Sequence, residues 1–546
     1  MAAVGEAPTL FLRKATGLVK GWSKFDAFVY SFMSVNIVTL ALFGSWLFLG
    51  YAPTGQVIPA ILISGFFMTF LVITYASLIS VMPRAGGDYV WQSRVMGGGI
   101  AFVLAVTGWW FILWYWTPIY AAILNVEVFQ PLAALFKADG TIEFLASKNG
   151  IFVVCIVTAL LAAFLVSLGM EGYAKVQKVC FYIGIVGFAV IILVMLFGSR
   201  SGFESAFNQE SSNLFNVNNA YQAHIDTAAT DFPGLSLSPF LSSSTLALIP
   251  FLMFWIAWPN WGATLYGEVR GASDFKRVMS GMMYGLWITI AIAIVFLLLF
   301  SKFFGWDFFQ SANVNYANFY YGYTTDPVTP VWSYPPLLVG MFFHNSALAS
   351  LLILVFGAWF IGWAGTLFMS STRVIFAAAF DRVLPEKVAD VSERRHVPMW
   401  ALGLMLVPAL IVSAVYAYSL TFRSYLFAAT FVIVVTFFGT SIAAAILPWR
   451  KKQLYQNSPI ARYKVLGIPL ITFSGVITAL FLGWNIYKWI WPPLSNGNLY
   501  GINVPDSMYF MGGMYLLAVI IYIVAKVYRK RQGIDLSAVY KEIPVE

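Results

Sequence analysis

Residues 250–276 read PFLMFWIAWPNWGATLYGEVRGASDFK and decide the fold. The stretch is apolar enough to enter a membrane, yet Pro259 and Asn260 stand in its middle. Proline lacks a backbone N–H and its ring clashes with the carbonyl four residues earlier, so we expect the helix to kink or break near Trp258. Inside a bilayer, backbone groups freed by such a break persist only within protein or beside a watery cavity. Broken membrane helices typically form a transporter's substrate site, and a proline kink without a ligand is the alternative.

The composition of the chain is that of a membrane protein with many spans. The 546 residues are 60% hydrophobic and only 10% charged, which excludes an ordinary soluble domain. The first 25 residues contain basic side chains but no continuous apolar core, so no cleavable signal is expected. Cys155 and Cys180 both lie in apolar runs, which predicts packing roles rather than a disulfide.

Twelve apolar segments are long enough to cross a hydrocarbon core of about 30 Å. They lie near 26–50, 57–82, 100–128, 151–169, 176–198, 244–267, 277–304, 347–377, 398–418, 424–448, 467–492 and 509–528. The third is crowded with tryptophan and tyrosine between Trp109 and Trp116, which is typical either of an interfacial belt or of a cavity wall. The sequence therefore predicts an all-α integral membrane fold.

The net charge of +9 is distributed by loop rather than gathered in one patch. Alternate loops and both termini are rich in Lys and Arg, whereas the other loops contain few, so the positive-inside rule places both termini in the cytoplasm. The charge is thus a topology signal, and no nucleic-acid partner is expected. The partners that we expect are a lipid bilayer, here the cell membrane, and a small-molecule substrate.

The first span is interrupted by the polar residues of Ser34-Val35-Asn36-Ile37-Val38-Thr39. An asparagine in mid-span is costly unless it finds a partner, so Asn36 should face the interior of the bundle. If spans 1–5 and 6–10 are inverted repeats, the first and sixth spans correspond, and each carries a polar interruption. A transporter with five-plus-five symmetry has this pattern.

Four stretches resemble the amino acid-polyamine-organocation superfamily of transporters. They are Pro83-Arg84-Ala85-Gly86-Gly87-Asp88-Tyr89 after the second span, Gly267-Glu268-Val269-Arg270 after the sixth, Ser370-Ser371-Thr372-Arg373 at the end of the eighth, and Phe380-Asp381-Arg382-Val383-Leu384-Pro385 in the loop that follows. The similarity extends from about the first span to the tenth. It implies a permease of an amino acid or a related small amine.

The resemblance also implies a division of the chain. We expect two inverted repeats of five helices each, followed by two C-terminal helices. The segments are 1–25 (cytoplasmic N-terminal segment), 26–198 (first repeat), 199–243 (extracellular loop), 244–449 (second repeat), 450–528 (helices 11 and 12) and 529–546 (cytoplasmic tail).

The expected substrate site lies where the first and sixth spans are interrupted. The carbonyls of Phe254, Ile256 and Ala257 should face a substrate ammonium, while Trp258, Asn260 and Trp261 shape the pocket. Asn260 matches an Asn that some amino acid exchangers of the family carry in the unwound segment. Family members usually have a Gly-Ser-Gly-like run in the first helix. Ile37-Val38-Thr39 occupies that place here, so we expect Asn36 and Thr39 to bind the substrate through their side chains.

Charged residues near the cytoplasmic ends of the spans are expected to act as a gate or loop clamp. They are Arg84, Asp88, Glu268 and Arg373, and the pair of Arg84 and Asp88 is expected to anchor the loop between the second and third spans. Several family members place a Lys on the fifth helix seven residues after a Val-Gln, and the corresponding residue here is Gly184. That place is then empty, watery or filled by an ion near a hydroxyl such as that of Thr366. Because no buried carboxylate is evident as a proton carrier, the hypothesis is sodium-linked or ion-independent transport.

Other chemistry is not indicated. The three histidines have no metal-ligand spacing, and no Ser, His and Asp combination suggests a hydrolase, so neither a metal, a cofactor nor an enzyme is expected. We expect secondary active transport by alternating access. A membrane sensor or scaffold with the transporter fold is the alternative, and a channel is the third possibility.

Overall fold

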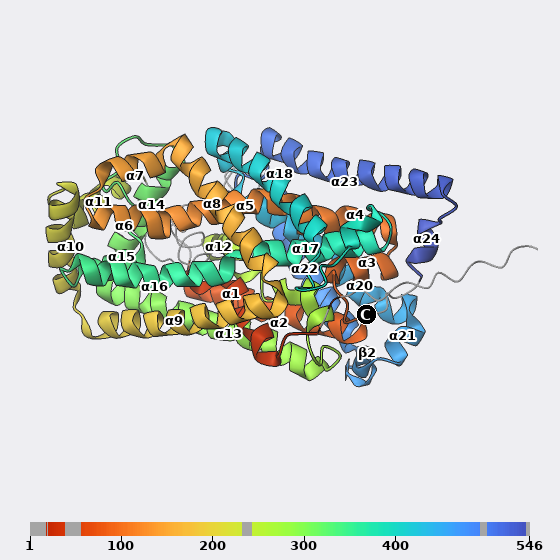
Figure 1. The fold of residues 1–546 in the computed structure, drawn as a ribbon. Coiled ribbons are helices and arrows are strands. Elements are labelled where there is room, and N and C mark those ends of the chain that lie inside the picture. Colours follow the sequence, from red (N-terminus) through yellow and green to blue (C-terminus); the bar gives the residue numbers. More distant parts are fainter. Residues whose placement is uncertain (1–17, 19, 39–55, 232–242, 492–499, 542–546) are drawn as a thin grey trace, which may run out of the picture.

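The computed structural model describes residues 18, 20–38, 56–231, 243–491 and 500–541. Long helices run along the axis of one elongated bundle (Figure 1). They are α1 (Lys24–Val35), α2 (Val57–Val81), α4 (Gly98–Val106), α5 (Ile112–Leu124), α8 (Lys148–Ser167), α9 (Gly169–Phe197), α12 (Ser243–Ile256), α13 (Phe275–Phe300), α16 (Ser346–Ala364), α17 (Thr366–Phe380), α18 (Met399–Tyr418), α20 (Leu426–Arg450), α22 (Leu470–Ile490) and α23 (Pro505–Arg531).

Shorter elements connect and extend the long helices. The helices are α3 (Gly87–Val95), α6 (Gln130–Leu135), α7 (Asp139–Ala146), α10 (Arg200–Phe215), α11 (Ala220–Asp231), α14 (Trp306–Tyr320), α15 (Pro335–Met341), α19 (Leu420–Arg423), α21 (Lys452–Gln456) and α24 (Leu536–Val539). π-Helical turns are η3 (Thr107–Phe111), η4 (Asn125–Phe129) and η6 (Ser301–Gly305), and 3₁₀ turns are η5 (Trp261–Glu268), η7 (Glu386–Ala389) and η8 (Pro459–Arg462). A hairpin pairs β1 (Lys464–Val465) with β2 (Ile468–Pro469).

The number of spans agrees with the sequence. Eleven segments of the described chain are long and apolar enough to cross a membrane. The helix α1 lies in the segment expected to form the first span, and the residues of that segment beyond 38 are outside the described chain. The prediction of an all-α membrane protein with about twelve spans is therefore confirmed.

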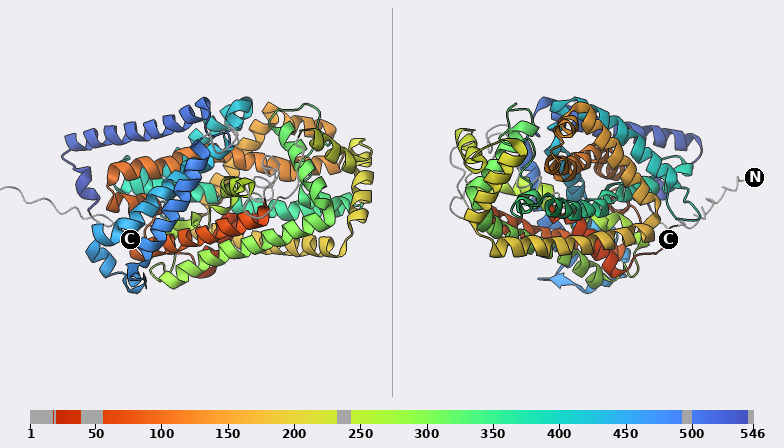
Figure 2. Two further views of the ribbon diagram at one scale, coloured as in Figure 1. Left: turned by 180° about the vertical axis from the view of Figure 1, so that it is seen from behind. Right: turned by 60° about the vertical axis from the view of Figure 1, so that its left-hand side comes forward.

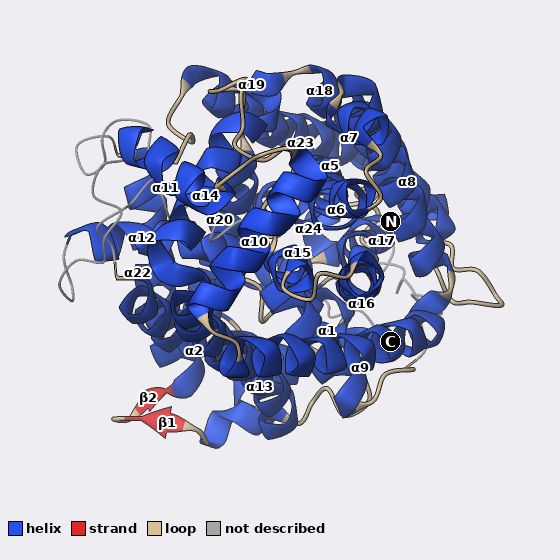
Figure 3. Ribbon diagram, turned by 90° about the vertical axis from the view of Figure 1, so that its left-hand side faces the viewer, coloured by secondary structure: helices blue, strands red, loops and turns tan. Residues whose placement is uncertain are grey.

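Both ends of the described chain lie at one end of the bundle. There, the backbone of Trp22 bonds to Glu268 and Arg270, and α24 packs beside α3 and α4. Figure 2 shows α23 along the outside, next to α4. The opposite end faces the viewer in Figure 3 and carries α7, α10, α11, α14 and α19. The segment 199–243, expected to be a loop, is largely helical where it is described, because α10 and α11 occupy most of it.

Local sequence signals explain several of the helix ends. Ser23 and Asp26 form a capping box at the start of α1, with Asp26 Oδ2 accepting from the Ser23 backbone at 2.8 Å. Asp274 caps α13 through the backbone N–H of Arg277. Gly86 has a φ of 93°, which L side chains rarely adopt, and it begins α3 directly after the span α2. The chain is thereby turned back into the bundle, and this positions the buried side chains of α3.

Candidate functional site

The sixth span is broken where Pro259 predicts a break. The helix α12 ends at Ile256, residues 257–260 are not helical, and the chain resumes as the 3₁₀ turn η5. Two of the backbone carbonyls near the break accept side-chain bonds: the Pro259 carbonyl from Ser31 Oγ at 2.9 Å, and the Phe254 carbonyl from Trp258 Nε1 at 2.7 Å. The predicted break is confirmed, and protein groups satisfy these two carbonyls.

The first span is interrupted at Asn36. The helix α1 ends there, and Asn36 adopts the left-handed conformation with a φ of 52°. Its Oδ1 accepts a hydrogen bond from Trp359 Nε1 of α16 at 2.9 Å, and its side chain is fully buried. Asn36 therefore faces the interior of the bundle, as its place in mid-span predicted. Thr39 lies outside the described residues.

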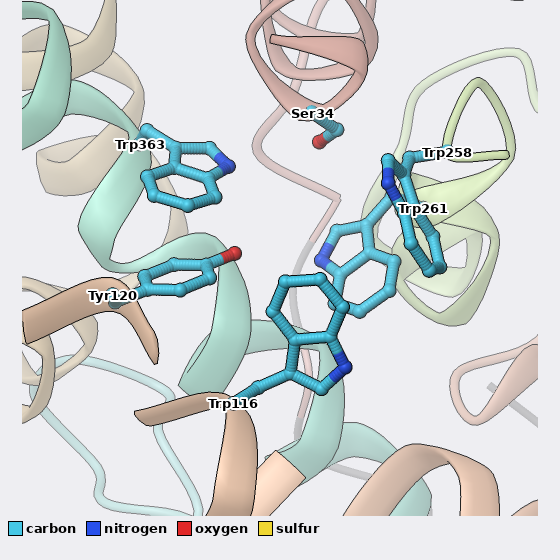
Figure 4. Close-up of a pocket in the computed structure, with 6 residues that line it drawn as sticks. All are labelled: Ser34, Trp116, Tyr120, Trp258, Trp261 and Trp363. Atoms are coloured by element: carbon cyan, nitrogen blue, oxygen red, sulfur yellow. The ribbon is translucent and has the colours of Figure 1, made fainter. Parts of the chain in front are cut away.

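An aromatic cavity lies between these two interruptions (Figure 4). Its lining consists of one hydroxyl from α1 and five aromatic side chains from the third, sixth and eighth spans. These residues are Ser34, Trp116, Tyr120, Trp258, Trp261 and Trp363. The cavity holds about 10 Å³ of free volume, which is enough for about one water molecule. The structure is thus a closed form, and a larger ligand needs movement of the surrounding side chains.

The aromatic rings of the cavity contact one another closely. Tyr120 stacks on Trp363 with ring centroids 3.5 Å apart, and Trp258 meets Trp261 edge to face at 5.3 Å. Trp116 packs edge to face against Trp258 at 5.6 Å. Figure 4 shows the Ser34 hydroxyl directed into the space among the rings. The faces of these rings carry negative charge density, so the arrangement suits a cationic group.

Only some of the predicted site residues line the aromatic cavity. Trp258 and Trp261 line the cavity, whereas the buried residues Phe254, Ile256 and Ala257 do not. Asn260 is fully buried, and within the described part of the chain neither atom of its side-chain amide makes a hydrogen bond of 3.5 Å or less. An unpaired buried amide is costly, so this residue has unused capacity for a ligand.

Four lining residues were not among the predicted site residues. Ser34 lies in the polar interruption of the first span, which was a usable signal. Trp116 belongs to the aromatic run of the third span, and its burial favours a cavity wall over an interfacial belt. Tyr120 and Trp363 carry no local signal, because they meet only through the packing of α5 against α16.

Two buried ion pairs lie on the side of the cavity that faces the chain ends. Arg373 donates to Glu268 from Nε at 2.7 Å and from Nη2 at 3.0 Å. Arg94 makes a second two-pronged pair with Asp381, which the sequence reasoning missed. Planar, two-point pairs of this kind fix orientation as well as charge. They join η5 to α17 and α3 to the end of α17.

A model of the family described as Amino acid permease matches residues 26–535. The chain belongs to the amino acid permease family. None of the curated proteins compared with it matches the chain. The family assignment makes this permease a multi-pass membrane protein that transports a small molecule, and not an enzyme.

The expected pairing of Arg84 with Asp88 does not form in this permease. Asp88 is fully buried, and its Oδ1 accepts from Tyr75 and from Thr440, each at 2.5 Å. Arg84 bonds instead to the Pro83 carbonyl. The prediction is wrong because the turn at Gly86 directs the Asp88 side chain into the bundle, away from Arg84.

The space expected beside Gly184 is occupied at the Cβ position by an aromatic ring. A Cβ atom added to Gly184 would meet the ring of Trp359 at 2.2 Å, so the indole of Trp359 packs directly against Gly184. The Thr366 hydroxyl lies 3.4 Å from the Tyr120 hydroxyl, and the Thr366 carbonyl accepts from Tyr30 at 3.1 Å. The described contacts do not bring Gly184 and Thr366 together around an ion.

The expectation that buried carboxylates are missing is wrong as well. Glu127 lies in η4 within the third span with Oε1 unpaired, and Asp88 lies in α3 between two spans. Burial raises the pKa of Asp88 to about 6. Proton coupling therefore does not lack a buried carboxylate as a carrier. Within the described part of the chain, no group of three His, Cys, Asp or Glu side chains is arranged to hold a metal ion.

Proposed function

We propose that this permease moves an amino acid or a related small amine across the cell membrane by alternating access, with the aromatic cavity as its transport site. The observation that carries the proposal is the position of the cavity. It lies where both the first and the sixth spans lose their helical conformation, and transporters of this kind bind substrate at such discontinuities near the bilayer midplane.

The cavity offers groups that suit a substrate ammonium. The faces of Trp116, Trp258 and Trp363 attract a cation, and such contacts are worth about 2 kcal/mol or more when desolvated. Ser34 adds a hydroxyl, and the unpaired amide of Asn260 adds both a donor and an acceptor. Ile256 and Ala257 contribute backbone carbonyls beside the break. We keep Thr39 as a side-chain contact from the first span and assign Asn36 to orienting Trp359.

The closed cavity supports a cycle in which its walls separate. On the side of the chain ends, Trp261 packs against Trp109 with ring centroids 4.7 Å apart and donates to the Thr366 carbonyl. On the other side, Trp116 stacks on Phe254 at 5.2 Å. We infer that these two contacts are the inner and outer gates, and that each opens in turn. The Arg373–Glu268 pair would hold the inner gate while it is closed.

The orientation and the repeats belong to the same proposal. Basic loops place the end of the bundle that carries both termini in the cytoplasm. Residues 26–198 and 244–449 form the two inverted repeats, 199–243 an extracellular segment, and 450–528 the last two helices. The segments 1–25 and 529–546 are then cytoplasmic.

Counterflow tests the function. Proteoliposomes containing the purified protein are loaded with one unlabelled amino acid or amine at a time, and entry of the labelled compound is measured. We expect saturable entry that requires the internal compound. Entry that does not saturate indicates a channel, and no entry for any compound of a broad panel favours a membrane sensor or scaffold.

A further inference from the structure

A second cavity lies among residues of α5, η4, α14 and α19. The helices α14 and α19 lie at the end of the bundle opposite the chain termini (Figure 3). The second cavity has a free volume of about 320 Å³ and shares no lining residue with the aromatic cavity. Its walls combine tyrosine and phenylalanine rings with amides, hydroxyls and a single arginine. The residues used below are Asn125, Gln130, Tyr316, Tyr320 and Arg423.

Arg423 is the unusual member of this wall. Its side chain is only 7% exposed, and its Nη2 makes a long hydrogen bond of 3.3 Å to the Ala417 carbonyl. Its Nε has no acceptor. The guanidinium lies 5.7 Å from the ring centres of Tyr320 and Tyr416, which offsets part of its charge. A guanidinium has five N–H donors, so most of its capacity is unused.

No carboxylate of the described residues forms an ion pair with this charge. The segments 39–55, 232–242 and 492–499, which join described parts of the chain, contain no Asp or Glu in their sequence. A buried charge without a partner costs several kcal/mol, and such a group is normally paired in the functional state. An anion that enters the cavity supplies the missing partner.

A second unpaired atom lies in the same wall. Asn125 is 3% exposed, and its Nδ2 donates to the Leu145 carbonyl at 2.8 Å, which fixes the orientation of the amide. Its Oδ1 has no partner. Gln130 faces the same space, with Oε1 accepting from Tyr316. The wall of the cavity thus contains an unpaired donor on Arg423 and an unpaired acceptor on Asn125, together with the rings of Tyr316 and Tyr320.

We propose that this cavity is a binding site for a small carboxylate that also carries a hydrogen-bond donor. The carboxylate pairs with the guanidinium of Arg423, the donor bonds to Asn125 Oδ1, and the apolar part lies on Tyr316 and Tyr320. Guanidinium groups match the planar geometry of a carboxylate better than that of a spherical ion. The proposal does not depend on transport through the aromatic cavity.

Equilibrium dialysis with radiolabelled 4-hydroxybenzoate tests the site, using the purified full chain in a chloride-free buffer. We expect saturable binding of about one molecule per chain, and little competition from the neutral 4-hydroxybenzamide. Arg423→Gln removes the charge-assisted bonds and should weaken binding by about tenfold or more. Arg200→Gln, an exposed arginine at the same end outside the cavity, should bind as the wild type does.

A second variant covers the case in which Arg423→Gln does not fold. Ala146 lines the cavity from an exposed position at the end of α7, so Ala146→Trp fills the space without disturbing the core. Ala146→Trp should also weaken the binding of 4-hydroxybenzoate. If Arg423→Gln does not fold, the result for Ala146→Trp alone tests the proposal. Unchanged binding in the folded variants would overturn the proposal. So would no binding to the wild type, equal binding of the amide, or displacement by low millimolar chloride, which would make this a halide site.

Discussion

Arg373 and Glu268 form a two-pronged ion pair with both side chains almost completely excluded from solvent. The two residues come from different spans, Glu268 from the end of η5 and Arg373 from the middle of α17. The pair therefore ties the second half of the broken sixth span to the eighth. Because the Trp261 carbonyl also accepts from Ser370, η5 and α17 are held together next to the aromatic cavity.

Breaking this pair on one side should destabilise the protein. Glu268→Leu leaves the guanidinium of Arg373 buried without a counter-charge, and the loss of one partner costs about 3–5 kcal/mol. The double variant Arg373→Met with Glu268→Leu removes both charges and should unfold at a higher temperature than the single variant. Thermal unfolding in detergent measures this. A single variant as stable as the wild type would contradict the role of the pair.

Pro259 is expected to maintain the break in the sixth span. Pro259→Ala restores a backbone donor and favours a continuous helix, so transport should fall while membrane insertion stays intact. The variant Pro250→Ala is the matched control, because Pro250 lies inside α12 of the same span without breaking the helix. Counterflow rates of both variants are compared with the wild type. Full transport with unchanged affinity by Pro259→Ala would show that the break is not needed.

Asn36 and Asn260 should respond differently to replacement by leucine. Asn36→Leu removes the acceptor of Trp359 Nε1 and should lower the unfolding temperature. Asn260→Leu removes no hydrogen bond of 3.5 Å or less among the described residues, so it should weaken substrate binding with less loss of stability than Asn36→Leu. Hydrogen bonds between membrane helices average only about 0.6 kcal/mol, so both stability effects are modest. Normal binding by folded Asn260→Leu would remove Asn260 from the site.

Asp88 should make stability depend on pH. Its pKa is raised to about 6 from 3.8, so the folded protein holds the proton at a pH where the unfolded chain has lost it. The contribution of Asp88 to the free energy of unfolding is fully present below pH 3.8 and is lost as the pH rises through 6. Between pH 5 and 7 the wild type should lose about 1 kcal/mol more than Asp88→Asn, measured by thermal unfolding. Equal pH profiles would contradict the assignment.

Other charged or polar side chains lie on α3 and on the elements around Asp88. They are Tyr75 of α2, Glu268 of η5, and Arg373 and Asp381 of α17, with Arg94 on α3 itself. Four of these residues form the two ion pairs, Glu268 with Arg373 and Arg94 with Asp381.

The variant Asp88→Asn also tests whether transport is coupled to protons. If Asp88 carries a transported proton, an imposed pH gradient drives uptake by the wild type but not by Asp88→Asn. Stimulation by sodium alone would support the sodium hypothesis instead.

Local chemistry explains which features the sequence predicts well. Pro259 acts on its own turn of helix, so the break at Trp258 follows from one residue and its neighbours. Apolar length predicts the spans for the same reason. The polar residue Asn36 could be placed inside the bundle because a membrane offers an unpaired amide no alternative.

Contacts between distant segments could not be predicted in this way. Asp88 bonds to Thr440, 352 residues later, and Arg94 to Asp381, 287 residues later. A charge pattern suggested the nearby Arg84 as the partner of Asp88, but the fold brings a hydroxyl there instead. Likewise, the space at Gly184 depends on Trp359 of another span, and no pattern around Gly184 reveals that this indole fills it.

The central claim is that substrate occupies the cavity between the first and sixth spans, and labelling of Ser34→Cys tests it most directly. Both native cysteines, Cys155 and Cys180, are buried, so the added thiol stands out from a weakly reactive background. The labelling rate with a small thiol reagent is measured with and without the compound that counterflow identifies. We predict that saturating substrate slows labelling severalfold in a variant that still transports. Labelling at the same rate with and without substrate would contradict the claim.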